Sequence, residues 1–212
     1  MSNYIKTKSE LLFEAFCEEH DFQCNKIPPS SEKTPDYEIV LKEAKIIVEV
    51  KQIDPNLLEE EKIKEFIKRG TVTIRSELGK RIRGKITDAQ NKFSKAMENR
   101  NPSILVLYNN VKLYKHTDPK DILSGMYGQL CFPVAPGGPI GNMELGPNRK
   151  MTKTTNTSIS AIGILKENNS GKPFLAIYHN LYASVPLNPD ILSGIPVMQY
   201  SMAPWLDWKD MN

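Results

Sequence analysis

The chain has 212 residues, of which 40% are hydrophobic and 25% are charged, and these values predict one soluble domain over residues 1–212. The net charge of +3 is small, and the three cysteines lack the spacing of a metal site or a disulfide framework. No segment is apolar enough to span a membrane, and residues 1–4 do not begin a signal peptide, so we expect a cytoplasmic protein.

The first predicted element is a helix that ends near His20. Thr7 and Glu10 have the spacing of a capping box, in which each side chain satisfies a free backbone amide at a helix start. Glu14 lies one turn after Glu10 on a flank of the apolar stripe. That stripe is formed by Leu12, Phe13 and Phe16. A capping role for Glu10 and a solvent-exposed role for Glu14 remain alternatives to a functional one.

After a strand over residues 22–27, two further strands are predicted at residues 36–41 and 46–52, joined by a polar turn. Asp36 opens the first of these, and Glu49 and Lys51 lie near the end of the second. Residues two apart on a strand share a face, so Glu49 and Lys51 project together. Charged groups at the end of an apolar run are unfavourable unless they are paired or bind something.

The two acids of this hairpin, Asp36 and Glu49, would repel each other if they converged. At about 4 Å and an effective dielectric constant near 20, the repulsion is of order 4 kcal/mol. A divalent cation would turn this repulsion into attraction, and Mg²⁺ prefers one or two carboxylates with water and phosphate oxygens. The alternative is a solvated hairpin with ordinary surface charges, which the preceding Ile-Ile-Val run disfavours.

Positive charge is concentrated in the next segment, where helices are predicted over residues 55–70 and 78–99. Residues 62–100 contain twelve Lys or Arg and four Asp or Glu. We expect contacts between the second helix and nucleic-acid phosphates, although most charged helix faces are simply solvated. The candidate phosphate-binding residues are Arg81, Arg83, Lys85 and Lys92.

The second half of the chain is less informative. A buried strand is predicted within residues 102–110, a long Gly- and Pro-rich loop over residues 124–147, and a hairpin from strands 159–165 and 174–179. His179 ends this hairpin and is expected to be structural. Two tryptophans, Trp205 and Trp208, would pack on the core or on a partner chain.

Pro35-Asp36 and Glu49-Val50-Lys51, in this hairpin context, resemble the motif of the PD-(D/E)XK nucleases. The predicted order of helix, three strands, helix and strand is also that of the superfamily's common core. The resemblance therefore implies an α/β fold with a restriction-endonuclease-like αβββαβ core over residues 1–110. Residues 111–212 would form a loop and hairpin extension around the mixed central sheet.

The resemblance also implies a mechanism, which is Mg²⁺-dependent phosphodiester hydrolysis with Mn²⁺ as a substitute. Asp36, Glu49 and the Val50 carbonyl would hold the metal, and Lys51 would orient or deprotonate the attacking water. Glu10 would reach the metal site, with Glu14 as the alternative. We expect an endonuclease rather than an exonuclease, acting on DNA rather than RNA, in bacterial defence, restriction or repair.

The competing hypothesis is a module that binds nucleic acid or protein and keeps the nuclease fold without turnover. A binding module does not require the trio of Asp36, Glu49 and Lys51, so we favour the enzyme. The sequence leaves homodimer formation open.

Overall fold

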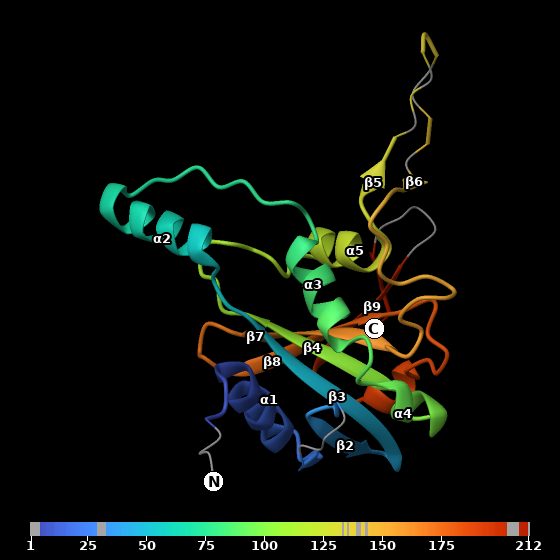
Figure 1. The fold of residues 1–212 in the computed structure, drawn as a ribbon. Coiled ribbons are helices and arrows are strands. Elements are labelled where there is room, and N and C mark those ends of the chain that lie inside the picture. The colour runs from blue at the N-terminus through green and yellow to red at the C-terminus, as the bar shows by residue number, and fades with distance from the viewer. Residues whose placement is uncertain are drawn as a thin grey trace.

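The computed structural model describes residues 5–28, 33–132, 134, 136–138, 141–142, 144–202 and 208–211. One central sheet, with helices on both of its faces, organises these residues (Figure 1). Its strand order is β1-β2-β3-β4-β7-β8-β9-β10. The strands are β1 (Gln23–Lys26), β2 (Tyr37–Leu41), β3 (Ala44–Ile53), β4 (Ser103–Asn109), β7 (Ala161–Glu167), β8 (Pro173–His179), β9 (Val197–Met202) and β10 (Trp208–Asp210).

The sheet is mixed. Strands β1, β2 and β3 pair antiparallel, β3 pairs parallel with β4, and β4 pairs parallel with β7. Strands β7 and β8 form the predicted antiparallel hairpin, which joins the same sheet as the N-terminal strands. The α/β class is therefore confirmed, and the order of elements over residues 8–109 begins with a helix and three strands, as predicted.

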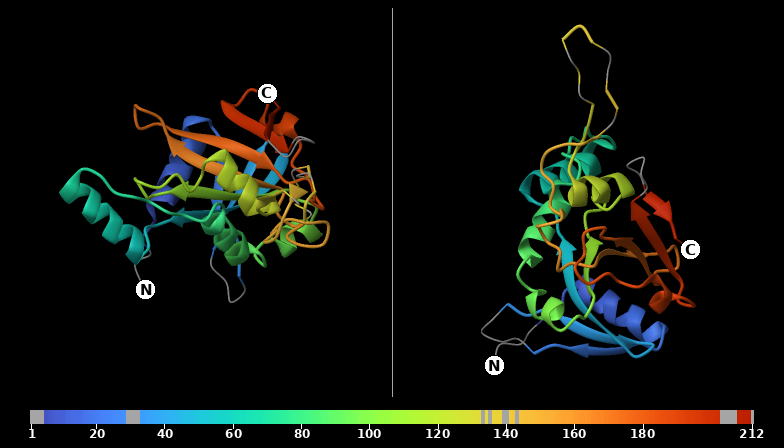
Figure 2. Two further views of the ribbon diagram at one scale, coloured as in Figure 1. Left: turned by 90° about the horizontal axis from the view of Figure 1, so that it is seen from above. Right: turned by 90° about the vertical axis from the view of Figure 1, so that its right-hand side faces the viewer.

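Helices cover the two faces of the sheet. Helix α1 lies on one face, and α3, α4 and α5 lie on the other, whereas α2 stands away from the sheet (Figures 1 and 2). None of the helices in the described residues is long and apolar enough to cross a membrane. The helices are α1 (Lys8–Glu19), α2 (Leu57–Arg69), α3 (Lys80–Ala89), α4 (Ser94–Glu98), α5 (Pro119–Tyr127) and the short 3₁₀ turn η1 (Pro189–Leu192).

Strand β3 contributes to a hydrophobic cluster on each side of the sheet, because its side chains alternate between the two faces. Ile46, Val48 and Val50 pack with Phe13 and Phe16 of α1. On the opposite face, Ile47 and Ile53 pack with residues of α3, α4 and α5. Glu49 and Lys51 lie between Ile47 and Ile53 in this alternation, so they project toward the face covered by α3.

Two expectations about the elements after β3 are wrong. The helix predicted over residues 78–99 is two helices, α3 and α4, separated by a turn at residues 90–93. The segment 124–147 is not one long loop, since its first four residues end α5 and the short strands β5 (Leu130–Cys131) and β6 (Glu144–Leu145) pair within it. Helix α5 and strand β9 were not predicted at all.

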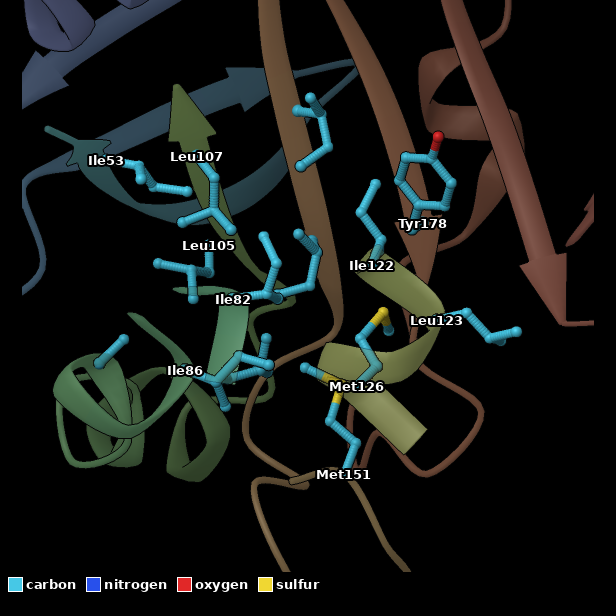
Figure 3. Close-up of a cluster of buried hydrophobic side chains, with 14 of the residues drawn as sticks. Ile53, Ile82, Ile86, Leu105, Leu107, Ile122, Leu123, Met126, Met151 and Tyr178 are labelled. Carbon is cyan, nitrogen blue, oxygen red and sulfur yellow. The ribbon is translucent and has the colours of Figure 1, made fainter. Parts of the chain in front are cut away.

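A close crossing of α3 and α5 fixes the position of α3 over the sheet. Figure 3 shows Ile82 of α3 and Met126 of α5 in the cluster that also contains Leu105 and Leu107 of β4. A Cβ atom on Gly125 would collide with the Ile82 side chain, so α5 can approach this closely only with glycine at position 125. By contrast, a Cβ atom on Gly84, in the middle of α3, would meet nothing within 4 Å.

We expect Gly125→Ala to destabilise the protein by about 1–3 kcal/mol through overpacking. Ile82→Ala should cost about 2–5 kcal/mol because it opens a cavity. The double variant should cost less than the sum, since the shortened side chain leaves room for the new methyl group. Urea unfolding measures all three. Gly84→Ala is the control and should stabilise by about 0.5–1 kcal/mol. Strict additivity of the two changes would contradict the crossing described here.

Candidate active site

The structure brings Asp36 and Glu49 to directly opposite positions. In the antiparallel pairing of β2 with β3, Tyr37 lies opposite Val48, so the next pair along the register is Asp36 and Glu49. Tyr37 and Val48 both face α1, so Asp36 and Glu49 both face α3. The Asp36 charge contributes to raising the pKa of Glu49, which is consistent with this proximity.

Glu49 is a fully buried carboxylate with an uneven set of partners. Its Oε1 atom accepts from Lys51 Nζ at 2.5 Å and from Lys92 Nζ at 2.6 Å. Its Oε2 atom is buried and has no hydrogen-bond partner among the described residues. Burial and the Asp36 charge raise the pKa of Glu49, while the two lysines oppose this shift. The lysines therefore offset the charge of Glu49 through Oε1, and Oε2 can accept a ligand.

Asp36 lies just before β2 and hydrogen-bonds to the backbone of β3 beyond the end of the β2–β3 pairing. The Ile47 N–H donates to Pro102 on the β4 side, so alternation directs the backbone groups of Val48 and Val50 toward β2. In agreement, the Asp36 N–H donates to Val48 O at 3.1 Å, and the Val50 N–H donates to Asp36 Oδ2 at 2.8 Å. The Val50 carbonyl therefore faces the same edge as the Asp36 carboxylate.

Lys51 lies beside Glu49 at the end of the same face of β3. Burial alone would lower the pKa of Lys51, but its hydrogen bond to Glu49 and the charges of Glu49 and Asp36 outweigh burial and raise it. Lys51 is thus a protonated ammonium group at neutral pH, with about a quarter of its side chain exposed. In this state it can donate hydrogen bonds and offset negative charge.

Lys85 of α3 is a third cation near this site. It is half-buried and forms no hydrogen bond or ion pair with any residue in the described parts of the chain. Burial lowers the pKa of Lys85, and this effect, with the positive charges of Arg81 and Lys51, outweighs the opposing charges of Asp88 and Asp54. A partly desolvated ammonium group without a partner favours the arrival of an anion.

The other predicted phosphate-binding residues are placed differently. Lys92 lies in the turn between α3 and α4 and is held by Glu49, so it belongs to the site rather than to a solvated helix face. Arg81 is three-quarters buried and contacts Asp54 O and Glu59 Oε2. Arg83 is 7% exposed and bonds to Glu77 and to carbonyls of Leu78 and Ser124. The expectation that Arg83 is free to contact nucleic acid is therefore wrong.

The helix α1 glutamates do not join Asp36 and Glu49, because α1 covers the opposite face of the sheet. Glu10 forms the predicted capping box with Thr7 and pairs with Lys26 Nζ at 3.1 Å. Glu14 Oε1 accepts from the Tyr37 hydroxyl at 2.8 Å. The expectation that Glu10 or Glu14 lies at the metal site does not hold in this arrangement, and each instead has a structural partner on the α1 side.

The chemistry of the site fits a hard divalent cation. The available oxygens are the free Oε2 of Glu49, the Asp36 carboxylate and the Val50 carbonyl. No group of three or more His, Cys, Asp or Glu side chains in the described residues could hold a metal ion. Mg²⁺ is bound by one or two carboxylates, with water and phosphate supplying the other ligands.

The remaining predicted residues include a histidine with a partner of its own and two tryptophans. His179 is buried and bonds to Gln199 Oε1 at 3.0 Å, and burial lowers its pKa, as expected for a structural histidine. The cysteines are free. Trp205 lies outside the described residues, and only the backbone of Trp208, in β10, is described.

Comparisons with family models, with curated protein sequences and with solved structures found no match. The interpretation of the site therefore depends on its geometry and chemistry.

The two lysines that share Glu49 Oε1 give a testable prediction for stability. Lys92→Met should destabilise the metal-free protein by about 1–3 kcal/mol, because it removes one of two partners of a buried anion. Lys64→Met, at an exposed position of α2, is the control and should have little effect. Urea unfolding provides the measurement. Equal stability of the two variants would mean that the Lys92 contact does not support the buried carboxylate.

Proposed function

We propose that the protein is a Mg²⁺-dependent nuclease that hydrolyses phosphodiester bonds in DNA. The observation that supports this most strongly is the fully buried Glu49, whose Oε2 atom has no partner among the described residues and which faces Asp36. A buried acceptor without a partner is unfavourable, so the position of Oε2 suggests that a ligand binds it. The ammonium groups of Lys51 and Lys85 near the two acids suggest that this ligand arrives together with a phosphate.

In this proposal each side chain has a distinct task. Asp36, Glu49 and the Val50 carbonyl would hold the metal, which would supply Lewis acidity and lower the pKa of a water molecule. Lys51 donates to the water or to the phosphate and stabilises the charge that develops during attack. Lys92 holds Glu49 Oε1, which leaves Oε2 as the oxygen that would take the metal. Lys85 binds a non-bridging phosphate oxygen.

The lysines at the site suit a polyanionic substrate. Lys51 and Lys92 both contact Glu49, and Lys85 lies near Lys51, with the carboxylates of Asp54 and Asp88 also near it. Ammonium groups placed in this way would contact nucleic-acid phosphates and release their counterions. We propose an endonuclease acting on DNA, with bacterial defence, restriction or repair as the setting.

The proposed activity is tested by incubating the protein with single- and double-stranded DNA and RNA, in Mg²⁺, Mn²⁺ or EDTA. We expect cleavage of DNA in either metal and none in EDTA. Binding without cleavage on every substrate would favour a non-catalytic nucleic-acid-binding module.

Metal binding should stabilise the folded protein through Asp36. At a Mg²⁺ concentration about 100 times the Kd, the free energy of unfolding should rise by about 2.7 kcal/mol. Asp36→Asn should abolish most of this increase, whereas Asp190→Asn, at an exposed position in η1, should retain it. Thermal unfolding with and without Mg²⁺ measures the difference. An unchanged metal effect in Asp36→Asn would exclude this residue as a ligand.

Lys51→Met should lower single-turnover cleavage by about 10²–10³-fold, because its charge acts on the transition state. Metal affinity and DNA affinity in Ca²⁺ should stay close to wild type, unlike those of Asp36→Asn. Lys166→Met, on β7, controls for the loss of a surface charge. Wild-type cleavage rates in Lys51→Met would refute the proposed role.

Lys85→Met should weaken DNA binding and reduce the slope of log Kd against log salt by roughly 0.9, the value for one phosphate contact. Lys80→Met changes an exposed lysine of the same helix and should leave the slope closer to that of wild type. A titration of DNA affinity against salt in Ca²⁺ separates the two variants. Identical slopes would show that Lys85 does not contact phosphate.

A further inference from the structure

A cavity of about 520 Å³ lies immediately beside the candidate active site. Pro35, which precedes Asp36, and Lys92, which holds Glu49, are both part of its lining. Ile47, which lines the cavity, lies two residues before Glu49 on the same face of β3, so it is about 7 Å from Glu49 along the strand. A group bound here would therefore be about one nucleotide away from a phosphate at the site.

The lining of this cavity combines apolar and hydrogen-bonding surfaces. Ile27 and Ile47, together with Pro35, supply apolar surface for a flat ring. Asn91, Asn99 and Asn101 also line the cavity, and a side-chain amide offers both donors and an acceptor. None of these three amides is bonded to another residue within the described parts of the chain.

Lysines also line the cavity, and Glu38 is the acid that lies among its described lining residues. Glu38 is paired with Lys45 at 3.0 Å, and Lys92 is paired with Glu49. The lysines are Lys33, Lys45, Lys92 and Lys95. A lining of apolar side chains, asparagines and lysines matches a nucleotide, which presents a flat base, polar base edges and phosphates.

We propose that this cavity binds an unstacked nucleobase next to the scissile phosphate, so that the substrate is single-stranded DNA or DNA with an unpaired nucleotide at the cleavage point. The inference rests on the proposed nuclease function, because it places the base relative to the phosphate at Glu49. A base inside a regular duplex is stacked and paired, so it cannot enter the cavity unless it leaves the helix. The size of the cavity is within the range of small-ligand pockets, about 300–1,000 Å³.

The test compares two strands of equal length in Ca²⁺, one of ordinary single-stranded DNA and one composed of abasic nucleotides. Both strands present the same phosphates, so a difference in affinity reports contacts to the bases. The wild type should bind the base-bearing strand roughly tenfold more tightly, a difference in the range of one good side-chain pair with a base edge. A regular duplex should be cleaved more slowly than the single strand.

Two variants connect this preference with the cavity. Ser94→Trp fills the cavity from the exposed first residue of α4 and should remove the preference for bases. Glu98→Trp adds the same side chain one turn later, outside the lining, and should keep the preference. The smaller double change of Asn99→Ala and Asn101→Ala should reduce the preference while leaving the fold undisturbed.

Equal affinity of the wild type for the two strands, together with cleavage of DNA, would overturn the base-binding inference and leave the nuclease proposal intact. A base preference that Ser94→Trp and Glu98→Trp change equally would also overturn it. Failure of the wild type to bind or cleave any strand would overturn both proposals.

Discussion

Glu49 is a carboxylate without exposed surface, and the arrangement of the site depends on how its charge is balanced. Two ammonium groups, from Lys51 and Lys92, share its Oε1 atom, while Oε2 has no partner among the described residues. Removing such a charge from water is unfavourable unless partners surround it. The parallel pairing of β3 with β4 and the packing of α3 bury Glu49. The chemistry of the site therefore depends on the fold.

The close approach of α3 to α5 links the core to the chemistry. Gly125 allows Ile82 to pack against α5, and the next turn of α3 then holds Lys85 above the end of β3. The turn after α3 brings Lys92 within 2.6 Å of Glu49. Of the three cations near the two acids, Lys85 and Lys92 therefore depend on how hydrophobic packing positions α3, whereas Lys51 belongs to β3 itself.

Local sequence patterns predicted the hairpin and the capping box well, because alternation and capping depend on neighbouring residues. The register that places Asp36 opposite Glu49 follows from the polar turn at residues 42 and 43. The sequence could not predict that α1 covers the face of the sheet opposite to the one toward which Glu49 projects, since the choice of face depends on tertiary packing. For the same reason Lys92 and Arg83 looked like equivalent surface cations, although one pairs with Glu49 and the other is buried by α5 contacts.

The central claim is that Asp36 and Glu49 Oε2 form a divalent-metal site. The most direct measurement is anomalous diffraction from crystals soaked in Mn²⁺. The account predicts an anomalous peak within about 2.0–2.4 Å of oxygens of both carboxylates, the range of hard-cation coordination. A strong peak at another position, with none beside Asp36 and Glu49, would contradict it.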